Sequence, residues 1–208
     1  MTIMPKQVDH DFRRRSIASA AIRVIDAVGL DAARLTDVAR EGEVTTGAVT
    51  HYFASKDAVI EAALAEVVRR ILDGQAAVDD NVLAADDLIG ALSSFLPVDE
   101  EARRDWRVWF AFWGRAIVNE RLRALHRDYY AEISRRLTRT LTILQDAGRL
   151  PPGATAADVA DAVIAVIDGL GVRATFEPDL WPPARQVRVL HLLLIPILSN
   201  PGGGETAR

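Results

Sequence analysis

The sequence predicts an all-α protein with an N-terminal three-helix helix-turn-helix lobe and a C-terminal helical lobe. Apolar residues recur at the three- and four-residue spacing of amphipathic helices through most of the chain. No segment alternates apolar and polar residues as a half-buried strand does, and no repeat is present. Hydrophobic residues make up 50% of the 208 residues, which is enough for a packed core.

The composition argues against several classes of protein. The chain has no Cys, which excludes disulfides and thiolate metal sites. Its four His residues lack metal-ligand spacing, and no phosphate loop, dinucleotide motif or convincing acid–base pair occurs. No apolar run approaches the ~20 residues that span a bilayer, and the first ten residues do not resemble a signal peptide. We therefore expect a cytoplasmic protein that is not an enzyme and has no metal and no cofactor.

Two long helices are predicted in the first third of the chain. The first covers residues 8–28, with an apolar side from Phe12 to Val28, and it ends at Gly29. The second covers residues 56–72 and is apolar along one side over its whole length. We expect the first to support the short helices that follow it, and the second to connect the two lobes.

Two short helices are predicted between these long ones. Thr36 is the expected N-cap of the first, and Gly42 ends it because glycine accepts the left-handed conformation just past a C-cap. Thr45 or Thr46 caps the second, and Ser55 caps the long helix that follows. Two short helices joined by a tight turn form a helix-turn-helix.

The second short helix carries side chains suited to DNA. In a helix-turn-helix it enters the major groove with its N-terminal residues against base edges. Its small residues would let the backbone approach DNA, and its hydroxyls and imidazole can contact bases and phosphates. The candidate DNA-binding residues are Arg34, Thr36, Thr45, Thr46, Gly47, Ala48, Thr50, His51, Tyr52 and Lys56. The residues alone also allow a plain helical hairpin with a polar outer face.

The net charge of −4 does not by itself favour DNA. Residues 1–60 contain eight Lys/Arg and eight Asp/Glu, so they are neutral overall and residues 61–208 carry the whole −4. DNA binding requires only a local positive patch. Arg13, Arg14 and Arg15 either supply phosphate contacts or form the solvated end of a helix.

Residues 34–60 resemble the DNA-binding lobe of the TetR family of transcriptional regulators. The match lies in Leu35-Thr-Asp-Val-Ala39, in the Gly42-x-Val44 turn and in Thr46-Gly-Ala-Val-x-His-Tyr-Phe-x-x-Lys-Asp57. The resemblance implies a repressor that binds a near-palindromic operator as a homodimer. We expect a DNA-binding domain at residues 1–55, a connecting helix at 56–73, an effector-binding and dimerisation domain at 74–200, and a disordered tail at 201–208.

The last two of the five helices predicted beyond residue 82 are apolar on nearly all sides. Such helices must be buried on nearly all sides, most simply against the core and a second subunit. A fully internal position in a monomer is the alternative. The predicted dimer-interface residues are Val163, Ile167, Leu190, Leu194 and Ile197.

Large aromatic residues occupy one face of the helix predicted at residues 101–118. They either belong to the core or form the wall of a ligand cavity, where Trp faces bind cations. Asp168, a lone acid in an apolar helix, would face a cationic ligand, an Arg or solvent. Arg107 and Arg115 flank the aromatic face and keep an anionic ligand open. The candidate ligand-binding residues are Trp106, Trp109, Phe110, Trp113, Tyr129 and Asp168.

A second resemblance concerns the effector lobe. Trp109-Phe-Ala-Phe-Trp113, Asn119-Glu-Arg-Leu-Arg123 and Ile167-Asp-Gly-Leu170 are similar to the BetI-like, choline-responsive branch of the family. This implies a repressor that choline releases from DNA. We expect a homodimeric repressor released from its operator by a small-molecule effector, either cationic or aromatic. The alternatives are a DNA-binding dimer or activator without a ligand, and an enzyme that uses the aromatic cavity.

Overall fold

The computed structural model of the chain describes residues 6–76 and 85–198, and these form nine helices and no strand. The predicted all-α fold is therefore confirmed for these residues. The predicted tail at residues 201–208 lies outside them. None of the described helices is long and apolar enough to cross a membrane.

The helices are divided between two compact units that do not follow chain order. The first unit contains residues 1–70 and 104–123, and the second contains residues 71–103 and 124–208. Residues 104–123 thus share a unit with the N-terminal part of the chain, although they follow it by more than thirty residues in sequence.

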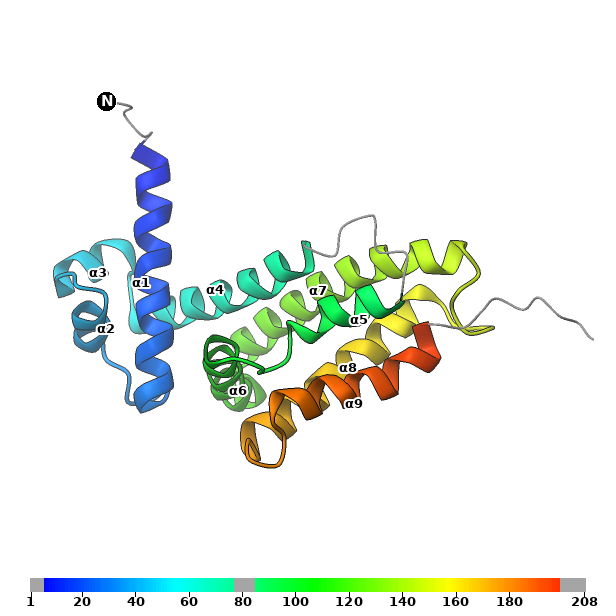
Figure 1. The fold of residues 1–208 in the computed structure, drawn as a ribbon. Helices are drawn as coiled ribbons and strands as arrows, with labels where there is room; N and C mark the ends of the chain where they lie inside the picture. The colour runs from blue at the N-terminus through cyan, green and yellow to red at the C-terminus, as the bar shows by residue number, and fades with distance from the viewer. Residues whose placement is uncertain (1–5, 77–84, 199–208) are drawn as a thin grey trace, which may run out of the picture. The chain divides into compact units, whose positions relative to one another are not determined.

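The first unit is built around α1 (Lys6–Val28), which packs against α2 (Leu35–Glu41); α2 in turn packs against α3 (Thr46–Tyr52) (Figure 1). Most of α4 (Lys56–Ala76) and of α6 (Glu100–Val118) also belongs to this unit. Its core contains Ile22, Val49, Phe53 and Leu64. The predicted apolar side of α1 was too long, because Phe12 and Val28 are exposed.

The ends of the short helices correct two predictions. Gly42 has a φ of −88°, so it is not left-handed, and the positive φ of 52° belongs to Glu43. Glycine is needed at position 42 for space, since a Cβ there would lie 3.2 Å from the Val38 carbonyl oxygen and 3.3 Å from the Ala20 Cβ. The N-cap of α2 is Arg34, and Thr36 lies inside the first turn. Gly29 ends α1 with a φ of +79°, as predicted.

The second unit contains α5 (Ala85–Ser93), most of α7 (Glu120–Asp146), α8 (Ala156–Phe176) and α9 (Pro183–Leu198). α9 lies beside α5 and α8 (Figure 1) and buries a stripe at every fourth residue. The stripe consists of Gln186, Leu190, Leu194 and Leu198.

Two helix ends of the second unit are well defined. Thr155 caps α8 through a capping box, in which its side chain and that of Asp158 each accept a backbone N–H. α5 ends at Ser93, because residues 94–96 donate backbone hydrogen bonds three residues back instead of four.

Candidate functional site

α3 has a polar outer face and is held in place by its buried inner face. On that inner face Val49 is completely buried. The hydroxyl oxygen of Thr45 accepts the N–H of Ala48 at 3.0 Å, which confirms the predicted N-cap. The Thr50 hydroxyl donates to the carbonyl of Gly47 at 3.1 Å. The exposed residues here are Thr45, Thr46, Gly47, Thr50 and His51, and Ala48 is half-buried.

The C-terminal end of α3 is held by α1. Arg14 donates to the carbonyl of Tyr52 at 2.5 Å, and its guanidinium lies 4.4 Å from the centroid of the Phe53 ring. The His10 and His51 rings lie 4.8 and 5.1 Å from the Tyr52 ring. From the sequence, Arg14 was expected either to contact phosphate or to lie at a solvated helix end. In the structure it donates to a carbonyl at the end of α3 that has no partner within its own helix.

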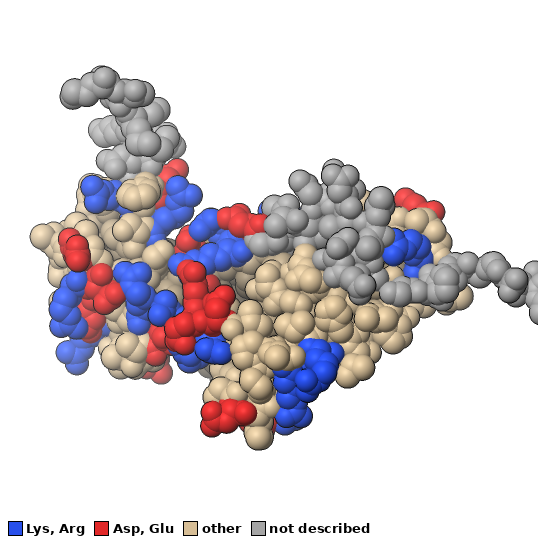
Figure 2. Space-filling model, viewed as in Figure 1, with Lys and Arg blue, Asp and Glu red and all other residues tan. Residues whose placement is uncertain are grey.

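The remaining predicted DNA-binding residues lie in the same unit. Arg34 and Thr36 are exposed at the start of α2. Lys56 is half-buried, and its Nζ donates to the carbonyl of Asp31 at 2.7 Å. Ser55 caps α4 by accepting the N–H of Ala58 at 3.1 Å. Figure 2 shows charges of both signs interspersed over α1–α3, in agreement with the neutral sum of this part of the sequence.

The aromatic set of α6 divides into core and partly exposed members. Trp109 is only 4% exposed and serves as core, whereas Trp106, Phe110 and Trp113 are half-buried. The Phe110 ring lies 5.3 Å from that of Trp106 and 5.1 Å from that of Trp113, measured between centroids. Ile117 is 71% exposed, so the aromatic face ends before it.

The arginines that flank this face pair with acids of the same unit. Arg107 contacts both carboxylate oxygens of Asp26, at 2.5 and 3.0 Å, and Arg104 lies 3.5 Å from the same carboxylate. Arg115 lies 3.6 Å from Asp31. These ion pairs connect α6 to α1 and to the loop that follows α1. The arginines that could have bound an anionic ligand therefore have carboxylate partners within the protein.

Asp168 forms part of a cluster in the second unit. The Tyr130 hydroxyl donates to its Oδ2 at 2.8 Å. Burial raises the pKa of Asp168 to about 6, although the hydrogen bond from Tyr130 acts in the opposite direction. The His126 ring stacks on the Tyr130 ring with 4.5 Å between centroids, and burial lowers the pKa of His126.

The sequence identified only part of this arrangement. Tyr130 and His126 were not predicted as site residues, although they lie four residues apart on one face of α7. The predicted Tyr129 is half-buried in the same unit. The four predicted aromatic residues of α6 belong to the first unit, whereas Tyr129 and Asp168 belong to the second.

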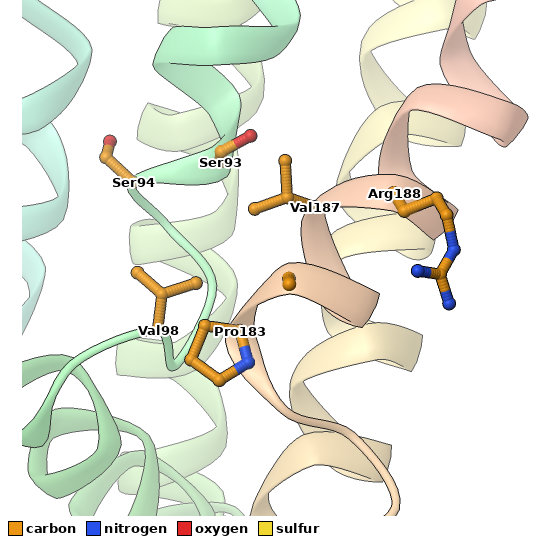
Figure 3. A pocket seen from close by; sticks show the side chains of 7 residues that line it. Ser93, Ser94, Val98, Pro183, Val187 and Arg188 are labelled. Atoms are coloured by element: carbon orange, nitrogen blue, oxygen red, sulfur yellow. The ribbon is translucent and has the colours of Figure 1, made fainter.

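A shallow groove of about 580 Å³ lies between the end of α5 and the start of α9 (Figure 3). Its lining is mainly apolar, and the Arg188 side chain points away from it. None of the predicted ligand-binding residues lines this groove. Its lining residues are Ser93, Ser94, Val98, Pro183, Ala184, Val187 and Arg188.

The residues predicted for dimerisation point mostly into the chain's own core. Val163, Ile167, Leu190 and Leu194 are buried within the second unit, and Ile197 is half-buried. The exposed apolar residues of α8 and α9 are different ones. They are Phe176, Leu192, Leu193 and Ile195.

Two family descriptions match the chain. Residues 84–195 match the C-terminal region of BetI-type transcriptional repressors, and residues 17–63 match the bacterial regulatory proteins of the tetR family. The HTH-type transcriptional regulator PksA of Bacillus subtilis is 31% identical, over 84% of this chain and 84% of its own. The HTH-type transcriptional regulator BetI of Paraburkholderia phytofirmans is 30% identical, over 90% of this chain and 94% of its own.

Solved structures show the same fold. A transcriptional regulator from Rhodococcus sp. Rha1 superposes with a TM-score of 0.76 and 30% identity, over 89% of this chain and 95% of its own. A putative transcriptional regulator from Saccharomonospora viridis in complex with choline superposes with a TM-score of 0.74 and 25% identity, over 87% and 94%.

Proposed function

The chain belongs to the TetR family of bacterial transcriptional regulators and has the C-terminal region of BetI-type repressors, and we propose that it acts as a homodimer on a near-palindromic operator. It is a DNA-binding transcriptional regulator and not an enzyme, as the sequence predicted. The proposed dimer reads two half-sites with its two α3 helices and is released by a small-molecule effector. We propose that it acts in the cytoplasm, because that is where bacterial operator DNA lies.

The outer face of α3 is the observation that supports operator binding best. Its exposed hydroxyls and imidazole are the groups that contact base edges and phosphates, and the exposed Gly47 allows close approach to DNA. The helix is fixed at its start by Thr45 and at its end by Arg14. A rigid helix with a polar face is what base readout requires, because a mobile one would lose conformational entropy on binding.

Operator binding can be tested on DNA selected from a random pool by the immobilised protein. Replacing Thr50 by Val keeps the side-chain shape and removes the hydroxyl, and we expect binding of the selected site to weaken by about 1–3 kcal/mol. Thr142→Val is the matched control, since Thr142 is an exposed α7 residue that also donates to a carbonyl of its own helix. Equal affinities of both variants and the wild type would contradict base readout through Thr50.

The exposed apolar residues of α8 and α9 support the proposed homodimer. Leu192 is 68% exposed, and Leu193, Ile195 and Phe176 are exposed as well. Leu192, Leu193 and Ile195 lie within one turn of α9, and exposed apolar side chains grouped in this way are a common mark of a protein–protein interface. We expect Leu192→Asp to shift the mass measured by light scattering from dimer to monomer. The control Ile117→Asp, at an exposed apolar position of the first unit, should stay dimeric.

A small-molecule effector is proposed from family membership and from the regulator that was solved with choline. The candidate contacts are the half-buried aromatic residues of α6 in the first unit or, separately, the Asp168 cluster in the second unit. An effector can release DNA only by as much as it prefers the conformation that does not bind the operator. A DNA-binding dimer without a ligand remains the second candidate, and insensitivity of the protein–DNA complex to every metabolite tested would favour it.

A further inference from the structure

We infer that a phosphate of the operator binds at the cluster formed by His10 of α1 and by His51 and Tyr52 of α3, and that the two histidines take up protons when it binds. His10 thereby joins the DNA-binding residues, and operator affinity depends on pH. This inference rests on the proposed function, since it concerns how the same operator is held. Three properties of this histidine–tyrosine cluster support it.

The first property is that the polar groups of the cluster are available to a ligand. His10 and His51 are exposed, and their rings lie 4.8 and 5.1 Å from the ring of the half-buried Tyr52. No residue within 6–76 or 85–198 forms a hydrogen bond with either imidazole or with the Tyr52 hydroxyl. Their N–H and O–H groups can therefore donate to an anionic oxygen.

The second property is the position of the cluster in the helix-turn-helix. The N-terminal residues of the second helix of such a motif contact base edges, so its last turn lies towards the sugar–phosphate backbone. His51 and Tyr52 are in this last turn of α3. His10 contacts the same tyrosine ring from α1, which is neither of the two short helices of the motif. The expected ligand is therefore a phosphate and not a base, in line with the large share of protein–DNA hydrogen bonds that go to the backbone.

The third property is the charge around the imidazoles. The Asp11 carboxylate lies 3.9 Å from Nδ1 of His10, and Arg13 and Arg14 follow one turn further along α1. α3 contains no charged side chain other than the ionisable imidazole of His51. The protein thus places charges of both signs on one side of the cluster and none on the other. A bound phosphate adds a negative charge, which favours the protonated form of a histidine.

The direction of the pH effect follows from linkage. A phosphodiester stays ionised near neutral pH, and it attracts an imidazolium more strongly than a neutral imidazole. The complex therefore binds protons that the free protein lacks, and operator affinity rises as the pH falls through the range in which histidine titrates. A proton that is held about tenfold more tightly in the complex strengthens operator binding by up to about tenfold.

The experiment is fluorescence anisotropy of the full chain with the DNA site selected from the random pool. We expect the wild type to bind this site about tenfold more tightly at about pH 6 than at about pH 8. The salt dependence of binding should be steeper at the lower pH by about one to two, because each protonated histidine replaces a counterion on a phosphate. His10→Gln and His51→Gln should each lose part of the pH effect, and the double variant should lose nearly all of it.

His191→Gln is the control, because His191 is a histidine of α9 in the second unit. We expect this variant to keep the full pH effect. Each result is a ratio of two affinities of one preparation, so a general loss of affinity in a variant does not alter it. Equal affinities at both pH values, an unchanged pH effect in His10→Gln, or a pH effect that persists in the double variant would overturn the inference.

The affinity of the wild type at about pH 8 separates this inference from the proposed function, since neutral histidines predominate there. Protein that selects no DNA at either pH would refute the proposed operator binding, and the phosphate site with it. Protein that binds its selected DNA equally well at both pH values would refute the proton-linked site alone.

Discussion

Replacing Asp168 by Asn should stabilise the free protein at neutral pH and change its stability little in acid. The amide keeps an oxygen that can accept the Tyr130 hydroxyl, so the substitution removes mainly the charge. The pKa of Asp168 rises from 3.8 to about 6 on folding, so the folded state binds the proton more tightly than the unfolded state. The contribution of this carboxyl to stability therefore falls as pH increases between these two values, and it stays low above them.

The size of the effect follows from the two pKa values. One pKa unit corresponds to ~1.36 kcal/mol, so the ionised side chain costs the fold about 3 kcal/mol from about pH 7 upward. About half of this cost is present at about pH 5, and little of it at about pH 4. For a chain of this length, 3 kcal/mol corresponds to an increase of roughly 6–12 °C in Tm.

Thermal unfolding of the wild type and of Asp168→Asn, followed by circular dichroism at several pH values between 4 and 8, measures this difference. The two melting temperatures should be similar at about pH 4, separate as the pH rises, and differ by a constant amount from about pH 7 upward. Asp161→Asn should follow the wild type at every pH. If the difference in melting temperature does not depend on pH, or if the variant is less stable at neutral pH, the charge of Asp168 does not destabilise the folded state.

Two further predictions concern the first unit. Gly42→Ala should lower the free energy of unfolding by about 1–3 kcal/mol in urea denaturation, because its Cβ would crowd the Val38 carbonyl and the Ala20 side chain. Gly47→Ala, where a Cβ would meet only the Thr45 hydroxyl oxygen at 3.7 Å, should not destabilise the fold, and equal losses in both variants would contradict this account. Arg14→Ala should weaken operator binding without changing its salt dependence, because Arg14 holds the end of α3. A salt slope lower by about one would instead identify Arg14 as a phosphate ligand.

Features that depend on neighbouring residues could be predicted from the sequence. Thr45 and Ser55 cap their helices as expected, since a cap needs only a hydroxyl three residues before a free N–H. Gly29 ends α1 as expected for an equally local reason, and it does so with a positive φ. The all-α fold and the helix-turn-helix likewise follow from periodicity and turn chemistry within short segments.

Features that depend on distant residues could not be predicted in this way. The lack of space for a side chain at Gly42 comes partly from Ala20, which lies on another helix. The Tyr130 hydroxyl donates to Asp168, which is 38 residues further along the sequence. Periodicity also fails for α8 and α9, because helices that are apolar on nearly every side do not reveal which side faces their own core. The residues predicted for the dimer interface were chosen from such helices, and four of the five lie inside the chain.

The ion pairs between α6 and α1 affect how this protein could be recombined with its relatives. Arg104 and Arg107 on α6 share Asp26 on α1, and residues 104–123 belong to the same compact unit as the helix-turn-helix. A hybrid regulator spliced once after residue 73 would separate that carboxylate from both of its guanidinium groups. A hybrid that takes its DNA-binding helices from this protein would therefore have to include α6, together with the tryptophans that α6 carries.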